Sequence, residues 1–207
     1  MKHEWRKHEK GLYLPKDNPV FIDIPKMVFL TIQGRGNPNS TEFSVKIGAL
    51  YAVSYAIKMC YKTDDIPKGY YDYTVYPLEG VWDIADEAKE NFTGTIDKDD
   101  LVYEIMIRQP DFIDEGYALR KLEQTKQKKP NQFLERIHFT SCTEGKCVQM
   151  LHNGYYENEP GTFQLMEEFC KENNYQRISK IHREIYLNDT RKTQPENLKT
   201  VLRFKVE

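Results

Sequence analysis

The sequence lacks any apolar run long enough to cross a bilayer, which excludes a membrane-spanning helix. It also lacks an excess of either charge, because 30 Lys and Arg residues stand against 32 Asp and Glu residues. The two signs are interspersed, so no basic surface for nucleic acid is predicted. The first ten residues lack the apolar core of a signal peptide. We therefore expect a cytoplasmic protein that binds neither membranes nor nucleic acid directly.

Cysteine is scarce, with four residues, and in the cytoplasm these thiols are expected to stay reduced. Cys142 and Cys147 flank residues 143–146, which we interpret as a tight turn. The two thiols could then approach each other across a hairpin or form half of a metal site. No second Cys or His pair has metal-ligand spacing, so we expect no metal site and no cofactor.

Aromatic residues are abundant, with 14 Tyr and 10 Phe, which suits a pocket or interface that needs flat apolar surface with a polar tip. A chain of 207 residues can form one sizeable core or two fused half-domains. Residues 1–25, including His3 and His8, form a charged leader that we expect to be loosely ordered.

The first half of the domain reads as strand, helix, strand, strand. A short extended piece at 20–24 ends at Pro25, and a polar loop occupies 91–100. Ser40 or Thr41 is expected to cap the helix. Periodicity and turn signals place the four elements at 27–33, 41–58, 70–77 and 101–108.

A connecting helix is predicted at 114–128, capped by Asp114, with apolar positions Tyr117, Leu119 and Leu122. Periodicity does not decide whether residues 133–142 form a strand or a short helix.

The second half repeats the order strand, helix, strand, strand. Its helix directs Phe163, Met166, Phe169 and Cys170 inward. The elements are expected at 146–152, about 161–172, 182–187 and 200–206. A repeat at about 26–110 and 145–207, joined by the helical connector, predicts one α+β domain over 26–207. Its antiparallel sheets would carry helices on one face and a ligand groove on the other.

The strand at 182–187 places His182, Glu184 and Tyr186 on one face, opposite Ile185 and Leu187. A carboxylate in the middle of such a strand is a candidate for cation binding or for general acid/base catalysis. The alternative is a carboxylate that simply faces water.

The chain resembles the GyrI-like small-molecule-binding family along nearly its whole length. The segments that carry the resemblance are Phe29-Leu30-Thr31-Ile32-Gln33-Gly34-Arg35-Gly36-Asn37-Pro38-Asn39, Pro77-Leu78-Glu79-Gly80-Val81-Trp82, residues 144–154, His182-Arg183-Glu184-Ile185-Tyr186-Leu187 and residues 189–200. The resemblance implies tandem strand-helix-strand-strand (SHS2-like) units around a groove.

The resemblance implies two kinds of function. Some relatives are effector domains of multidrug-responsive regulators, which hold flat hydrophobic cations between aromatic rings and a Glu. Others are stand-alone proteins similar to hydrolases that open the cyclopropane ring of DNA-alkylating natural products. The short, polar leader has no helix-turn-helix segment, which disfavours the regulator architecture.

Glu184 is the predicted charge of the groove, and Glu79 is the rival carboxylate. We place Glu79 in a turn at 77–80, where it would hydrogen-bond backbone amides. For Tyr51, Tyr55 and Phe169 the alternative is core packing, and for His152 a structural role. For Tyr156 the sequence does not decide whether the side chain contacts a ligand. Trp82, in a loop after Gly80, is expected to line the groove. The predicted ligand-binding residues are Glu184, Trp82, Tyr51, Tyr55, Tyr156, Phe169, Tyr186 and His152.

The leading hypothesis is a stand-alone protein that binds hydrophobic, aromatic or cationic small molecules. The first alternative is a cyclopropane-opening hydrolase, in which Glu184 activates water while Tyr186 or Tyr55 hydrogen-bonds the oxygen that gains charge. The second is a protein-interaction module whose groove accepts a segment of a partner. The physiological ligand and the oligomeric state stay open.

Overall fold

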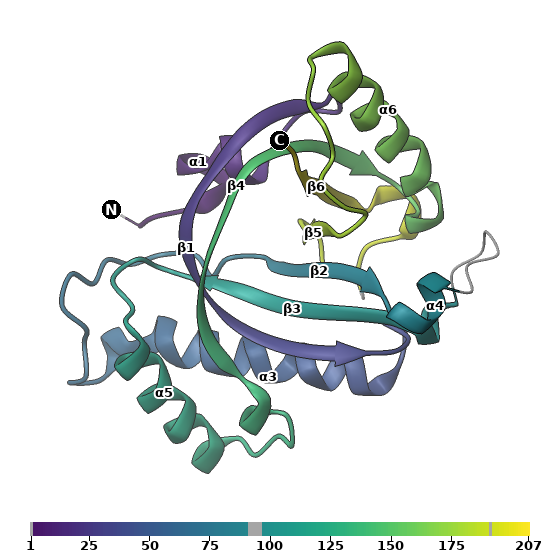
Figure 1. Ribbon diagram of the computed structural model, residues 1–207. Coiled ribbons are helices and arrows are strands. Elements are labelled where there is room, and N and C mark those ends of the chain that lie inside the picture. Colours follow the sequence, from purple (N-terminus) through teal and green to yellow (C-terminus); the bar gives the residue numbers. More distant parts are fainter. Residues whose placement is uncertain (1, 91–96, 191) are drawn as a thin grey trace. The chain divides into compact units, whose positions relative to one another are not determined.

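The computed structural model describes residues 2–90, 97–190 and 192–207. The other positions include the first residue of the leader, most of the polar loop predicted at 91–100, and Arg191 of the 189–200 segment, so these predictions lie outside the described residues. The chain forms two compact units (Figure 1). Unit 1 comprises Met1–Glu4, Met27–Leu78 and Asp83–Cys142, and unit 2 comprises Trp5–Lys26, Glu79–Trp82 and Thr143–Glu207.

Unit 1 is built on an antiparallel pair of strands, β1 (Val20–Arg35, from Met27 onward) and β3 (Leu101–Gln109). Helix α3 (Thr41–Lys58) runs along this pair (Figure 1). Its N-cap is Ser40, whose Oγ accepts a hydrogen bond from the Phe43 amide at 3.2 Å. Helix α5 (Glu115–Lys128) is capped by Asp114 in the same way, at 2.7 Å from the Tyr117 amide. Both predicted helices are confirmed.

Unit 2 holds a sheet in the order β2-β5-β6-β4, in which neighbouring strands are antiparallel. Helix α6 packs Met166 and Cys170 against Val148 of β4 and Phe204 of β6. This packing confirms the predicted inner face of the helix. The elements are β2 (Leu78–Ile84), β4 (His138–Asn153), β5 (His182–Tyr186), β6 (Lys199–Lys205) and α6 (Glu159–Glu172).

Short helical segments complete the described chain. The α-helical ones are α1 (Trp5–His8), α2 (Lys10–Tyr13) and α4 (Asp86–Glu90). The 3-10 segments are η1 (Met59–Lys62), η2 (Lys98–Asp100), η3 (Leu134–Arg136), η4 (Tyr156–Asn158) and η5 (Pro195–Asn197).

The strand predicted at 70–77 is wrong. Those residues follow an irregular path, and the strand β2 starts only at Leu78. Two of the aromatic residues that suggested a strand, Tyr73 and Tyr76, are instead fully buried core residues. The predicted turn at 77–80 and the predicted loop around Trp82 are also wrong, because residues 78–84 form β2.

The tight turn predicted at 143–146 is also wrong, because β4 runs through it without a break. Gly145 takes a positive φ of 75° within the strand, which glycine adopts at little steric cost. Cys142 and Cys147 consequently lie along one strand and do not face each other across a hairpin. The undecided segment 133–142 is a 3-10 turn followed by the start of β4. Likewise, β1 continues through Pro25.

The leader is not loosely ordered. Trp5 and Tyr13 are buried, with ring centroids 5.3 Å apart, because aromatic area gains most from leaving water. The Arg203 guanidinium donates to the Leu12 carbonyl at 2.7 Å. In α5, by contrast, Leu119 is exposed, so of its three predicted apolar positions only Tyr117 and Leu122 are buried.

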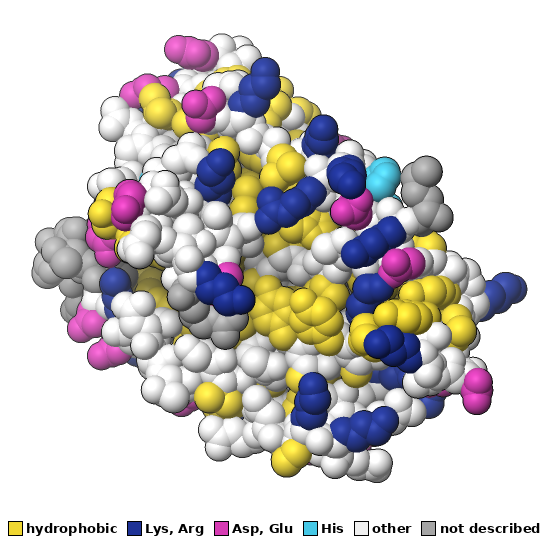
Figure 2. All heavy atoms as spheres, turned by 180° about the vertical axis from the view of Figure 1, so that it is seen from behind, with side chains coloured by type: hydrophobic (Ala, Val, Ile, Leu, Met, Phe, Trp, Pro, Cys, Tyr) yellow, Lys and Arg dark blue, Asp and Glu magenta, His cyan; other side chains and the backbone are white. Residues whose placement is uncertain are grey.

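The mixed α+β class with antiparallel strands is confirmed. Among the described residues, no helix combines the length and the apolar character needed to span a membrane. Lysine and arginine side chains are scattered among acidic ones over the face shown in Figure 2. All four cysteines are free thiols.

Candidate functional site

The polar face of β5 forms the centre of the candidate site, which lies wholly in unit 2. His182, Glu184 and Tyr186 share this face, as alternation predicted. The register with β2 places Glu184 opposite Gly80 and His182 opposite Trp82. Glu184 is buried, so the solvated alternative does not hold.

Gly80 makes room for the Trp82 indole beside the carboxylate. A Cβ at Gly80 would lie 2.7 Å from Trp82 Nε1 and 3.3 Å from the Tyr186 hydroxyl, which is too close for the indole to stay in place. Trp82 Nε1 donates to the Tyr186 hydroxyl at 2.9 Å, and the Tyr186 hydroxyl hydrogen-bonds Glu184. Burial, then the charge and hydrogen bond of Glu184, raise the pKa of Tyr186 well above its usual value.

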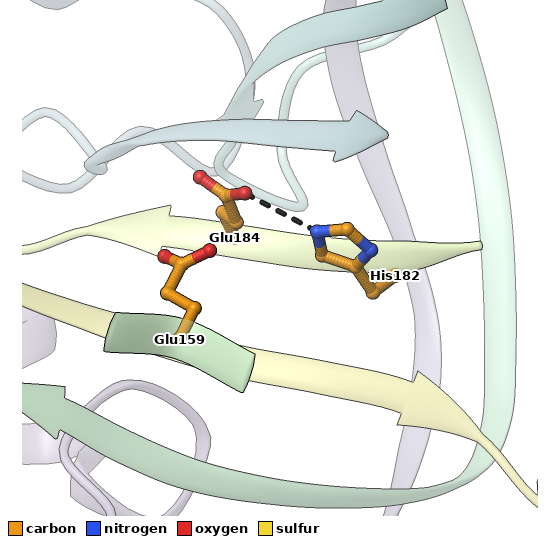
Figure 3. Close-up of side chains that lie close together, drawn as sticks. All are labelled: Glu159, His182 and Glu184. Atoms are coloured by element: carbon orange, nitrogen blue, oxygen red, sulfur yellow. Dashed lines mark hydrogen bonds and ion pairs between the residues drawn. The ribbon is translucent and has the colours of Figure 1, made fainter. Parts of the chain in front are cut away.

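Glu159, the first residue of α6, brings a second carboxylate to Glu184 (Figure 3). One ligand atom each of Glu159, His182 and Glu184 lie within 4.8 Å of one another. Burial, followed by the negative charge of Glu184, raises the pKa of Glu159 to about 9. Sequence reasoning missed this residue. Pro160 at the first turn of the helix was the available signal, since proline favours that position and would have moved the predicted start toward Glu159.

His182 is held in a defined orientation. Its Nδ1 lies 3.3 Å from the Lys180 carbonyl oxygen, and its Nε2 lies 3.2 Å from Glu184 Oε1. The Phe163 ring packs edge-on against the imidazole, with centroids 4.9 Å apart. Both contacts are with acceptor oxygens, so they fix the orientation of the ring and direct Nε2 at the carboxylate.

The other buried carboxylates of unit 2 are neutralised by arginines. Arg183 Nη1 donates to Glu79 at 2.7 Å, and its Nε donates to Glu144 at 3.0 Å. Arg203 Nη1 adds a contact to Glu144 at 3.2 Å. Burial would raise the pKa of Glu144, but the two guanidinium groups hold it below its usual value. The rival carboxylate Glu79 is therefore the partner of a buried arginine.

The remaining predicted residues of unit 2 have distinct surroundings. The Tyr156 ring stands edge-on to Tyr186 at 6.4 Å, so it borders the cluster. Phe169 packs against the core beneath α6. Both ring nitrogens of His152 bond to the chain itself, at 2.8 Å from Thr162 Oγ1 and 2.9 Å from the Tyr155 carbonyl oxygen. The contacts of Phe169 agree with the alternative of core packing, and those of His152 agree with the alternative of a structural role.

Tyr51 and Tyr55 belong to unit 1, where they lie on α3 with ring centroids 6.1 Å apart. Tyr55 is half exposed. Their contact with a ligand stays a prediction.

Residues 17–207 match the model of the GyrI-like small molecule binding domain. The chain belongs to this family. The resemblance inferred from five sequence segments is thereby confirmed, and binding of a small molecule is the general function of the GyrI-like domain. Comparison with curated protein sequences gives no significant match.

Three solved structures from Listeria innocua are similar to this GyrI-like chain over its whole length. A hydrolase encoded by lin2189 is 35% identical, with 100% of both chains covered and a TM-score of 0.90. A structure described as a hydrolase is 34% identical, covering 99% of this chain and 100% of that one, with a TM-score of 0.88. An uncharacterized conserved protein has the same identity, coverage and TM-score, 34%, 99% and 100%, and 0.88.

Proposed function

We propose that this GyrI-like protein binds an apolar small molecule beside Glu184 and hydrolyses it, with Glu184 as the general base. The observation that carries the proposal is the contrast among buried carboxylates. Arg183 neutralises Glu79, and Arg183 and Arg203 together neutralise Glu144. In the described part of the chain, no lysine or arginine pairs with Glu184. A carboxylate without a fixed cation keeps lone pairs that can accept a proton from water.

Tyr186 and Trp82 act as positioning residues in this proposal. The Tyr186 hydroxyl donates its single proton to Glu184, and its oxygen accepts a hydrogen bond from the Trp82 indole N–H. The pair therefore orients the carboxylate, and the hydroxyl is not available as a donor to substrate while this hydrogen bond persists. This assigns Tyr186 a different role from the oxyanion contact expected from the sequence.

The substrate class we propose is a cyclopropane conjugated to a carbonyl. Glu184 takes a proton from water, and the water oxygen bonds to a ring carbon. The ring C–C bond breaks, its electron pair moves to the carbonyl oxygen, and that oxygen takes up a proton. The product is the substrate plus one water. Such a strained substrate is already reactive, so a base that contributes about 10²–10⁴-fold is sufficient. Similarity to relatives named hydrolases, 34–35% identical over the whole chain, supports this class.

The experiment is incubation with a spirocyclopropane enone, followed by mass spectrometry of the ring-opened hydrated product. We expect turnover above the buffer rate, and a loss of about 10²–10⁴-fold in Glu184→Gln. Glu168→Gln, an exposed carboxylate on α6, is the matched control and should keep full activity. Absence of turnover above buffer would overturn the hydrolase proposal.

A second candidate function is binding of flat cations without turnover. It is favoured by the aromatic rings of Trp82, Tyr156 and Tyr186 beside a carboxylate that no arginine among the described residues neutralises. Glu184→Gln should then weaken a cationic dye far more than a neutral dye of the same shape. Equal weakening of both dyes would contradict this charge assignment.

Two broader proposals accompany this function. The chain order β1-α3-β2-β3 followed by β4-α6-β5-β6 supports the predicted tandem SHS2-like repeat. The four free thiols are compatible with a protein that works in the cytoplasm.

A further inference from the structure

The hydrolase and dye-binding proposals use Glu184 in the metal-free protein, and neither uses the cluster that this carboxylate forms with Glu159 and His182. A metal ion at the cluster would occupy Glu184, so a bound ion and the role of Glu184 as general base exclude each other. The cluster combines two carboxylates and one imidazole, and both carboxylates belong to buried residues. Burying polar oxygen atoms is costly unless a positive charge or hydrogen bonds compensate them. Tyr186 supports Glu184, but Glu159 Oε1 is buried and has no hydrogen-bond partner among the described residues.

The orientation of His182 bears on how the buried carboxylate oxygens of the cluster are compensated. Nδ1 lies 3.3 Å from the Lys180 carbonyl oxygen and Nε2 lies 3.2 Å from Glu184 Oε1, so the geometry directs Nε2 at the carboxylate. A single proton can bridge Nε2 and Glu184, yet it leaves Glu159 Oε1 without a partner. A metal ion can contact all three atoms at once.

We infer that Glu159, His182 and Glu184 form a binding site for a divalent transition-metal ion, with Zn²⁺ as the best fit. One imidazole nitrogen and two carboxylate oxygens are ligands that Zn²⁺ accepts in proteins, and three protein ligands leave a coordination position for water. The contact of Nδ1 with a backbone carbonyl is the support that metal-binding histidines usually have, and the Tyr186 hydroxyl supports Glu184 in the same way. This site replaces the expectation of no metal, which rested on local spacing alone.

The ligands also come from supported elements. Glu159 opens the 14-residue helix α6, and His182 and Glu184 lie in the middle of a four-stranded sheet in the same unit. Phe163, one turn along α6, packs on His182 and links the helix to the imidazole. Figure 3 shows the Glu159 carboxylate pointing toward the other two side chains. Packing therefore holds the three ligands close together before any ion binds.

The test is titration of the purified, chelator-treated full chain with Zn²⁺ alone, by isothermal titration calorimetry. We expect one site per chain, and binding weaker by about tenfold or more in Glu159→Gln and in His182→Asn. Co²⁺ should give the visible absorption bands of a four-coordinate site in the wild type and lose them in both variants. Two control variants, Glu168→Gln on α6 and His138→Asn at the start of β4, change exposed groups of the same types and should bind as the wild type does.

Thermal unfolding of each variant without metal shows whether the variant is folded. If Glu159→Gln does not fold, the comparison with the controls uses His182→Asn alone. Absence of Zn²⁺ binding, or equal affinity in cluster variants and controls, would overturn the site. The titration contains no substrate, so its result does not depend on whether the protein is a hydrolase.

Discussion

At the scale of single residues, Gly80 is as important to the candidate site as the residues with functional groups. It lies opposite Glu184 in the sheet, and its missing side chain leaves the space that the Trp82 indole occupies. The indole donates a hydrogen bond to the Tyr186 hydroxyl, and this hydroxyl hydrogen-bonds Glu184. The position of the carboxylate therefore depends on a residue that carries no chemistry of its own.

Gly80→Ala should displace Trp82 and break its hydrogen bond to Tyr186. We expect a cost of about 1–3 kcal/mol in unfolding free energy, because a methyl group is forced into a packed site. The measurements are denaturant unfolding and a change of tryptophan fluorescence in a Trp5→Phe background. Gly161→Ala is the matched control, since nothing lies within 4 Å of a Cβ at Gly161. Unchanged fluorescence in Gly80→Ala would contradict this role of the glycine.

At the scale of the elements, a buried ionic network ties the four strands of unit 2 together. Arg183 on β5 binds Glu79 on β2 and Glu144 on β4, and Arg203 on β6 binds Glu144 and Gln149. Removing one partner of a buried ion pair leaves an uncompensated charge, which typically costs about 3–5 kcal/mol. The network therefore links all four strands, on the face of β5 opposite the candidate site.

This network predicts the acid sensitivity of the fold. The pKa of Glu144 is lower in the folded chain than its usual value of 4.5, so folding favours the ionised carboxylate. The resulting stabilisation is complete above the usual value and is lost as the pH falls through the lowered pKa. Unfolding free energy measured between about pH 6 and pH 3 should fall less steeply in Glu144→Gln, which is less stable throughout the upper part of this range. Parallel curves for the two proteins would contradict the assignment, and Glu168→Gln should follow the wild type.

At the scale of the whole chain, unit 2 is assembled from three stretches that are far apart in sequence. The first stretch, Trp5–Lys26, binds to the last: Arg6 Nη2 donates to the Leu187 carbonyl at 2.5 Å, and Arg203 Nη2 donates to the Leu12 carbonyl. Gln149 Nε2 donates to the Gly11 carbonyl at 2.7 Å. The N-terminal segment is thus part of the core of this unit.

Trp5→Ala should destabilise the protein by about 3–5 kcal/mol, the usual cost of removing a buried tryptophan. For a chain of this size the change corresponds to a fall of about 6–20 °C in the unfolding midpoint. Differential scanning calorimetry provides the measurement. Lys10→Ala, which truncates an exposed side chain in the same segment, should leave the midpoint unchanged. A Trp5→Ala midpoint equal to that of the wild type would mean that the segment is an ordered but dispensable leader.

Local signals were sufficient to predict much of the fold. Alternation placed His182, Glu184 and Tyr186 on one face of a strand, since side-chain direction follows directly from the period of two. The capping residues Ser40 and Asp114 predicted where α3 and α5 begin, because each side chain accepts a hydrogen bond from the backbone amide three residues later. The family followed from motifs that are contiguous in the chain.

Tertiary structure alone decided the rest. Glu159 joins Glu184 only through the packing of α6 on the sheet, and Trp82 joins Tyr186 only through the register of β2 with β5. The segment that carries Trp5 is held by hydrogen bonds to residues at the other end of the chain, Leu187 and Arg203. Contacts of this kind depend on strand register and packing between distant segments, and no local pattern in the sequence encodes them. The sequence by itself therefore predicted Glu184 as the charge of the proposed site, and the fold determined which side chains surround it.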